Sequence, residues 1–225
     1  MNDGTYAFLV FVSSLALCGA AGAIVIGLQW LERARRRRQL SALARELGYE
    51  YREFDDSLGY IYVTRSPNAK TWPARVRNVI TGSTEGGRAV YYEFDAKGRE
   101  SSVRLSACAF HGPFSFGELR VTPKIPGDIL DIVHDRGIHL ESAEFNGRFL
   151  VQSDNKQFAF EVLTQKTMQF LLDNPFLEMR TRGDWIWFGH AEAPSAPAAK
   201  RIISMVTDFA ALLPHYLRRG ECRAE

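Results

Sequence analysis

Residues 90–109 read VYYEFDAKGRESSVRLSACA, and apolar residues alternate with more polar ones along both halves of this stretch. The alternating apolar positions are Val90, Tyr92 and Phe94, then Val103, Leu105, Ala107 and Ala109. A two-residue period is typical of a β-strand that buries one face. The halves are joined by a short stretch, so we expect two antiparallel strands.

The same period extends outward from this pair. Leu119 and Val121 alternate with polar neighbours, and the runs 60–64 and 74–80 predict two further strands. The glycine-rich segment 82–87 lacks the Lys and Ser or Thr of a P-loop and joins two strand patterns. It therefore predicts a hairpin loop. The apolar segment 112–117 is either a contact surface or a cover over the end of the sheet.

Helical patterns dominate the second half of the chain. We expect helices after Asp128, after Asp154 and after Thr164, and a last helix after a Pro- and Ala-rich linker at 193–198. Trp185 and Trp187 predict a strand in a hairpin with 177–181. These elements predict one α+β domain of antiparallel sheet with packed helices over 49–217, followed by a flexible tail over 218–225.

A stretch in the middle of this domain resembles a family of uncharacterised bacterial membrane-anchored proteins of unknown function. The resemblance lies in mainly apolar residues, namely Glu144, Phe145, Phe149, Val151, Ser153, Asp154, Ala159, Leu163, Met168 and Leu171. A preceding strand with glycine turns, matched by 79–92, adds to it. The resemblance covers about half of the chain. It implies a membrane-tethered α+β domain and carries over no catalytic residue.

The N-terminal region predicts a membrane anchor. No charged residue occurs between Asp3 and Glu32, and about 20 apolar residues suffice to cross the hydrocarbon core. Tyr6 and Trp30 stand near the two ends, where aromatic side chains favour the headgroup boundary. We therefore expect a transmembrane helix over 5–31.

Basic residues follow the apolar run instead of preceding it, which disfavours a cleavable signal peptide. The basic cluster consists of Arg33, Arg35, Arg36, Arg37 and Arg38. By the positive-inside rule it places the N-terminus outside and the domain in the cytoplasm, at the inner (plasma) membrane. A basic juxtamembrane helix over 32–48 then leads to the domain, because Leu40, Leu43 and Leu47 have helical spacing.

Small residues recur every four positions in the predicted span, at Gly19, Ala23 and Gly27. Such a face allows two membrane helices to approach closely. It is a candidate helix–helix contact for self-association. The bilayer itself and an unknown protein partner are the other expected partners.

The charge distribution argues against nucleic-acid binding. The chain of 225 residues carries a net charge of +2, but the arginine cluster accounts for all of the excess, and the residues that follow it sum to −1. Proteins that bind nucleic acid usually show a basic stripe or patch. With 46% hydrophobic residues, the chain is long enough to form a core without disulfides or a structural metal.

Side chains with catalytic potential are scattered. The three cysteines show no zinc spacing, and Cys108 with His111 lacks an orienting third group. The acidic and histidine residues of 128–135 are typical of a solvated helix face. We therefore expect a membrane-anchored, non-enzymatic interaction domain that needs no cofactor or metal. The alternatives are a tethered enzyme with a site around His111, Asp131 and His134, and a small-molecule sensor.

Overall fold

The computed structural model describes residues 26–55, 76–97, 102–124, 137–190 and 192–217. The chain divides into two units, Met1–Gln39 and Leu40–Glu225. The second unit holds an antiparallel sheet with helices packed on it, which confirms the predicted α+β class.

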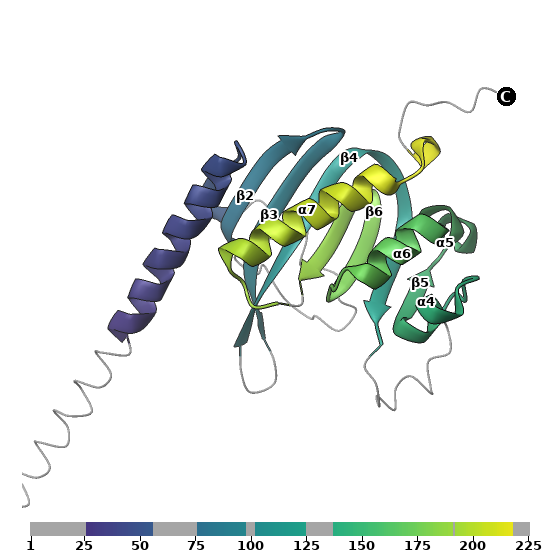
Figure 1. The fold of residues 1–225 in the computed structure, drawn as a ribbon, viewed down its shortest axis with the longest axis horizontal. Coiled ribbons are helices and arrows are strands. Elements are labelled where there is room, and N and C mark those ends of the chain that lie inside the picture. Colours follow the sequence, from purple (N-terminus) through teal and green to yellow (C-terminus); the bar gives the residue numbers. More distant parts are fainter. Residues whose placement is uncertain (1–25, 56–75, 98–101, 125–136, 191, 218–225) are drawn as a thin grey trace, which may run out of the picture. The chain divides into compact units, whose positions relative to one another are not determined.

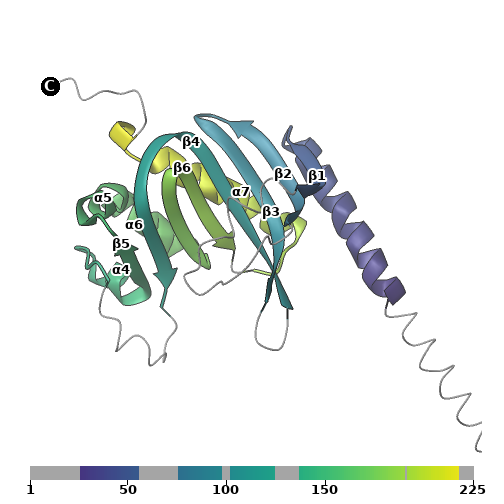
Figure 2. The same cartoon turned by 180° about the vertical axis from the view of Figure 1, so that it is seen from behind.

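Six described strands form the sheet, and all of their pairings are antiparallel. They are β1 (Glu50–Asp55), β2 (Val76–Thr84), β3 (Gly87–Lys97), β4 (Ser102–Pro123), β5 (Phe149–Ser153) and β6 (Glu178–His190). The order is β1-β2-β3-β4-β5, and β6 pairs with β4. The first part of β4 lies between β3 and β6, whereas its last part lies between β5 and β6. Figure 2 shows β4 as the long curved strand that all three share.

The pairing of β4 with β6 is interrupted near its middle, where the register changes. The register between them shifts on both sides of Phe116, and Gly183 opposite Phe116 has φ of +61°. A left-handed φ of this kind suits glycine and permits a bulge. Because of the shift, Met179 and Phe188 face the same core although they differ in parity.

The helices of the domain lie on one face of the sheet (Figure 1). They are α4 (Ala143–Arg148), α5 (Lys156–Val162), α6 (Gln165–Asp173), α7 (Ala196–Leu212) and the short 3-10 helix η1 (His215–Leu217). Thr164 caps α6 as predicted, by accepting a hydrogen bond from the Thr167 amide. For α5 the cap is Asn155 instead of Asp154. Helix α7 begins within the predicted linker, because Ser195 caps it and proline is tolerated in a first turn.

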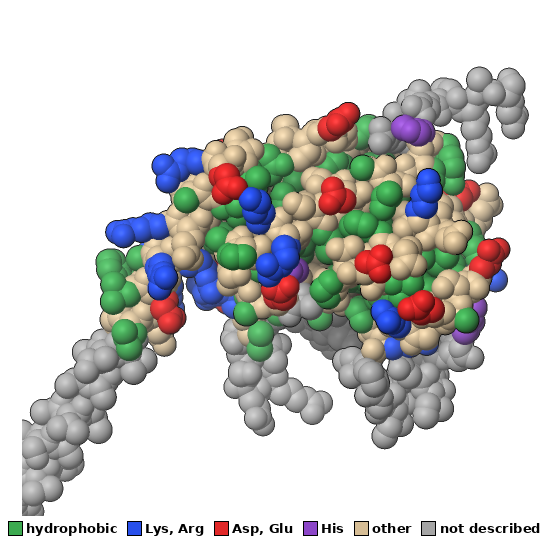
Figure 3. Space-filling view, viewed as in Figure 1, with side chains coloured by type: hydrophobic (Ala, Val, Ile, Leu, Met, Phe, Trp, Pro, Cys, Tyr) green, Lys and Arg blue, Asp and Glu red, His purple; other side chains and the backbone are tan. Residues whose placement is uncertain are grey.

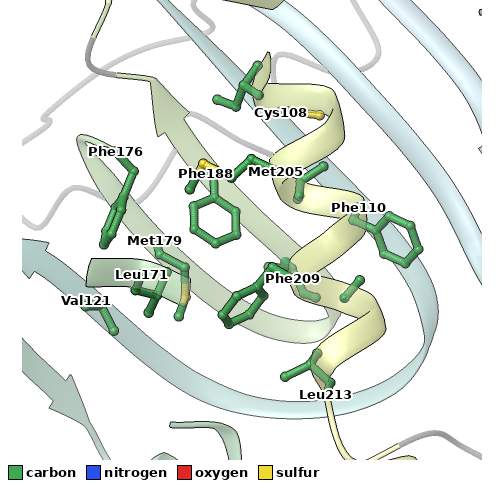
Figure 4. Packing of buried hydrophobic residues seen from close by; sticks show 14 of the residues in the cluster. Cys108, Phe110, Val121, Leu171, Phe176, Met179, Phe188, Met205, Phe209 and Leu213 are labelled. Atoms are coloured by element: carbon green, nitrogen blue, oxygen red, sulfur yellow. The ribbon is translucent and has the colours of Figure 1, made fainter. Parts of the chain in front are cut away.

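The main core lies between the sheet and these helices (Figure 4). Phe209 of α7 meets Phe188 of β6 edge-on, with ring centroids 5.2 Å apart, and Phe170 of α6 at 6.0 Å. Phe188 also contacts Phe176 edge-on at 5.7 Å. Edge-to-face pairs of this kind add to the free energy gained by burial. Aromatic packing thus joins α6 and α7 to β6.

Both faces of the central strands are buried, whereas the sequence predicted one. Tyr91 and Cys108 belong to the core under α7. A second cluster on the opposite face contains Val90, Tyr92 and Ala107, all fully buried. The period-two pattern misled because tyrosine and cysteine were counted with the polar positions, although both bury readily.

Two segments for which the sequence predicted other structures are parts of single strands. Residues 177–187 do not form a hairpin, because the Gly183 bulge lets β6 continue to His190. The apolar segment 112–117 lies within β4, where Phe114 and Phe116 are buried, so it covers the core and is not a contact surface. Between β2 and β3 the predicted loop shrinks to Glu85 and Gly86. The predicted strand at 60–64 and helix after Asp128 lie outside the described residues.

Residues 26–46 form a helix. The predicted juxtamembrane helix over 32–48 was expected to precede the domain, but its C-terminal part is buried in it. Leu40, Leu43 and Ala44 are buried in the domain core, and Glu46 pairs with Lys200 of α7 at 2.7 Å. The helix therefore becomes part of the domain from Leu40 onward, which agrees with the division of the chain after Gln39.

The predicted transmembrane helix over 5–31 gains no support from the structure. In the part of the chain that is described, no helix combines the length and apolarity needed to cross a bilayer. Most of the apolar run, residues 1–25, lies outside the described residues.

The aromatic core yields a stability prediction. Phe209→Ala removes a fully buried ring and leaves a cavity beside Phe188, so we expect a loss of about 3–5 kcal/mol in the free energy of unfolding. Leu212→Ala, on an exposed position of the same helix, is the matched control and should cost less than about 1 kcal/mol. Urea unfolding followed by circular dichroism measures both, and equal losses would contradict this packing.

Candidate functional site: a buried polar row across the sheet

Four polar side chains lie side by side across the sheet, and we call them the polar row: Asn78, Glu93, Ser106 and His190. Glu93 of β3 is directly opposite Ser106 of β4, and Ser106 is directly opposite His190 of β6. Residues directly opposite each other point to the same face. This is the face of Tyr91, Cys108 and Phe188, which α7 covers. All four side chains are buried, with exposures of 8%, 1%, 0% and 3% in the order given.

Hydrogen bonds satisfy the Asn78 end of the row. The Tyr51 hydroxyl donates to Asn78 Oδ1 at 2.8 Å, and Asn78 Nδ2 donates to Glu93 Oε2 at 2.9 Å. The Tyr91 hydroxyl donates to the other carboxylate oxygen, Oε1, at 3.2 Å. A buried carboxylate requires such donors, because desolvation without them is costly.

Asn78 reaches this position through an unusual backbone conformation. Its φ is +51°, and the β2–β3 register shifts between Arg77 and Ile80. Asparagine adopts the left-handed region more readily than other non-glycine residues. The bulge turns the Asn78 side chain toward Glu93 while Val79 and Ile80 still face opposite clusters.

The other end of the row is different. Ser106 Oγ and His190 Nδ1 are buried and have no hydrogen-bond partner among the described residues. His190 Nε2 lies 4.0 Å from Glu192 Oε1. Burial lowers the pKa of His190, and Arg201 lowers it further, although Glu192 opposes the shift. The imidazole is therefore favoured in its neutral form.

The order of the row separates it from a serine-hydrolase triad. In such a triad the histidine lies between the nucleophile and the carboxylate, which orients the ring. Here Ser106 lies in the middle, and Glu93 bonds to Asn78 and Tyr91. The arrangement connects strands and does not resemble a proton relay.

The opposite face of the sheet holds a second polar pair. His111 Nε2 lies 3.0 Å from Asp184 Oδ2, and the His111 ring contacts Trp185 with centroids 4.5 Å apart. On the same face, Trp187 Nε1 donates to the Tyr92 hydroxyl at 2.5 Å. Arg180 lies over Trp187 at 5.8 Å. Both tryptophans are thus held by neighbouring side chains.

The structure separates the residues that had suggested catalysis. Cys108 points into the core under α7, whereas His111 lies on the other face of β4 with Trp185. Burial also raises the pKa of the Cys108 thiol well above its usual range, which disfavours the thiolate. Asp131 and His134 lie outside the described residues. Across the described ranges, no group of three or more His, Cys, Asp or Glu side chains is arranged to hold a metal ion.

The predicted membrane-interface residues are placed only in part. Trp30 and the five arginines Arg33, Arg35, Arg36, Arg37 and Arg38 lie on the helix of 26–46. The Trp30 side chain is 62% exposed. Apart from its chain neighbours and the helix's own backbone, no atom of the described residues lies within 4 Å of a Cβ placed on Gly27. Tyr6, Gly19 and Ala23 lie outside the described residues.

Sequence reasoning missed the polar row. The alternating pattern placed Glu93 and Ser106 on the more polar face of their strands, and no motif in the sequence singles out His190. A usable signal was the pairing of the two strands around their turn, which sets Glu93 against Ser106. The addition of His190 depends on β6, which was predicted with the wrong length.

The sequence matches no family model and no curated protein. The fold is similar to that in the crystal structure of the mycobacterial trehalose monomycolate transport factor A, TtfA, with a TM-score of 0.56. The two sequences are 16% identical, and the match covers 79% of this chain and 96% of that one. At this level of identity the likeness establishes a shared fold.

The lowered pKa of His190 predicts a pH dependence of stability. The unfolded histidine binds its proton near pH 6.5, whereas the folded one binds it only at lower pH. Between these values the unfolded state holds more protons, so the free energy of unfolding should fall as pH drops below about 6.5. Urea unfolding of the wild type and of His190→Gln, from pH 7.5 to 5, measures the difference.

The other histidines are present in both proteins, so the comparison isolates His190. We expect a shallower decline in His190→Gln. Parallel curves for the two proteins would show that His190 is not held neutral by its surroundings.

Proposed function

We propose that this protein is a single-pass membrane-anchored protein whose α+β domain acts as a non-enzymatic interaction module in a transport system. The observation that carries the proposal is the fold shared with a protein named a transport factor, which extends over 96% of that chain. In the proposal the apolar N-terminal segment holds the domain at the inner membrane, and the domain binds a protein component of the system.

The anchor is supported by the helix that follows the apolar run. Its first described turns expose Ile26, Leu28, Trp30 and Leu31, which are between 57% and 68% exposed. At about 100° per residue these four positions cover an arc of about 200° around the helix, and the polar Gln29 lies on the remaining side. The arginine cluster 33–38 follows immediately. A broad exposed apolar surface followed by cations is typical of a helix that leaves the hydrocarbon core and enters the headgroup layer.

The arginines also support the orientation. Cationic residues next to a span remain on the cytoplasmic side, where each gains roughly 1 kcal/mol from anionic headgroups. The domain then lies in the cytoplasm and the N-terminus outside.

The domain surface supports a protein partner better than a polyanion. On the face that carries α7, basic and acidic side chains are interspersed, with hydrophobic groups between them (Figure 3). Exposed apolar residues occur on α5, at the end of α7 and on η1: Phe160, Leu212 and Tyr216 are 39%, 37% and 56% exposed. Burial raises the pKa of Tyr216, and the charge of Glu161, next to Phe160, adds to this shift. We propose that this apolar group contacts the partner.

The anchor is tested by fractionation and by a topology reporter. The full chain should stay in the membrane after an alkaline wash, and a reporter fused after Glu225 should be active in the cytoplasm. Leu15→Arg combined with Leu17→Arg should release the protein, because each arginine costs about 2.5–3.5 kcal/mol near the centre of a span.

Arginine substitutions supply the control for orientation. Replacement of all five clustered arginines by glutamine should give a mixed topology, whereas Arg45→Gln, later in the same helix, should leave it unchanged. A reporter active only outside the cytoplasm in the wild type would refute the proposed orientation.

The interaction role is tested with a photo-crosslinking amino acid at Tyr216 of the full-length protein in its host. We expect one discrete adduct with a membrane transport component, because Tyr216 is the most exposed of the three apolar residues. The same crosslinker at Lys166, on α6, is the control and should not give this adduct.

In the same crosslinking experiment, self-association through Gly19, Ala23 and Gly27 would give an adduct of two copies of this chain. Its product has twice the mass of the chain and should disappear in Gly27→Ile but persist in Ala21→Ile, which lies on the other side of a helix. Equal adducts from Tyr216 and Lys166 would refute the proposed contact surface.

A further inference from the structure

Two polar atoms at the His190 end of the polar row lack protein partners. Ser106 Oγ and His190 Nδ1 are both shielded from solvent, and neither makes a hydrogen bond within the described residues. Buried polar groups in folded proteins are almost always hydrogen-bonded, to protein or to ordered water. Their coincidence at one place therefore points to a shared partner.

The pairing of β4 with β6 brings the two atoms to one place. Ser106 and His190 are directly opposite in the ladder, and both side chains point to the face that α7 covers. Directly opposite Cβ atoms in an antiparallel pair lie about 4.5–5.5 Å apart. The two polar groups are therefore near neighbours that do not bond directly, and one small molecule can reach both.

We propose that Ser106 Oγ and His190 Nδ1 together bind one internal water molecule. Water both donates and accepts hydrogen bonds, so it suits a hydroxyl and a neutral imidazole in either tautomer. The surroundings favour an uncharged occupant. Glu93, the carboxylate of the row, already accepts from Asn78 and Tyr91, and the core residues beneath α7 are apolar.

The water extends the hydrogen-bonded row across the sheet. Protein hydrogen bonds join β1, β2 and β3 through Tyr51, Asn78 and Glu93. The water does the same for β4 and β6 just before the chain turns into α7 at Ala196. It thereby satisfies the end of the row that the protein leaves unpaired.

The test uses the full-length protein in detergent micelles with isotope-labelled histidine. The His190 ring signals are assigned by their loss in His190→Gln. We expect a cross-peak between a His190 ring proton and long-lived water in the wild type. It should weaken in Ser106→Ala, which removes one of the two groups that bind the water, and be lost in Ser106→Val, which also fills the space with methyl groups.

Each alternative outcome overturns the proposal. A wild type without the cross-peak excludes a long-lived water. An undiminished cross-peak in Ser106→Ala shows that the serine does not bind the water, and persistence in Ser106→Val shows that the water lies elsewhere. Ser204→Ala, at an exposed position of α7, is the matched control and should leave the cross-peak unchanged.

Discussion

The fold depends on one strand that three others share. β4 pairs with β3 and β6 along its first part and with β5 and β6 along its last, so its backbone bonds on both edges. The first part of this strand is also buried on both faces, since the successive residues Ala107 and Cys108 are both fully buried. The curvature of β4 and the bulge at Gly183 then bring residues from both ends of β6 into one core.

Burial of both faces explains why polar groups gather in the middle of the sheet. A polar side chain on a central strand needs a hydrogen-bond partner inside the domain, because bulk water does not reach it freely. Asn78 and Glu93 meet this requirement across β2 and β3. Satisfied networks of this kind favour one register over others, since a shift by one residue would leave the carboxylate without donors.

The sequence predicted the elements that depend on local signals. The strands around 90–109, the cap at Thr164 and the apolar face of the last helix all follow from period, cap and breaker residues. It did not predict β6 as one strand, because the glycine at 183 is typical of a turn. Only the pairing with β4 shows that it forms a bulge within a continuous strand. The polar row was missed for the same reason, since it arises only from the register of four strands, β2, β3, β4 and β6. Cys108 and His111 are three residues apart, and in a strand this spacing places their side chains on opposite faces, so the period-two pattern itself argues against a catalytic pair.

The pairing of β4 with β6 also has a consequence for synthesis on the ribosome. β3 and β4 form a hairpin that can assemble as soon as residue 123 has emerged, but β6 and α7 follow only after α4, β5, α5 and α6. During that interval the face of Cys108 and Phe110 lacks the cover that α7 later provides. Domains generally fold once their chain is complete, and exposed strands are prone to wrong pairing before then. The nascent chain is therefore most vulnerable to aggregation after β4 has been synthesised and before β6 and α7 have emerged.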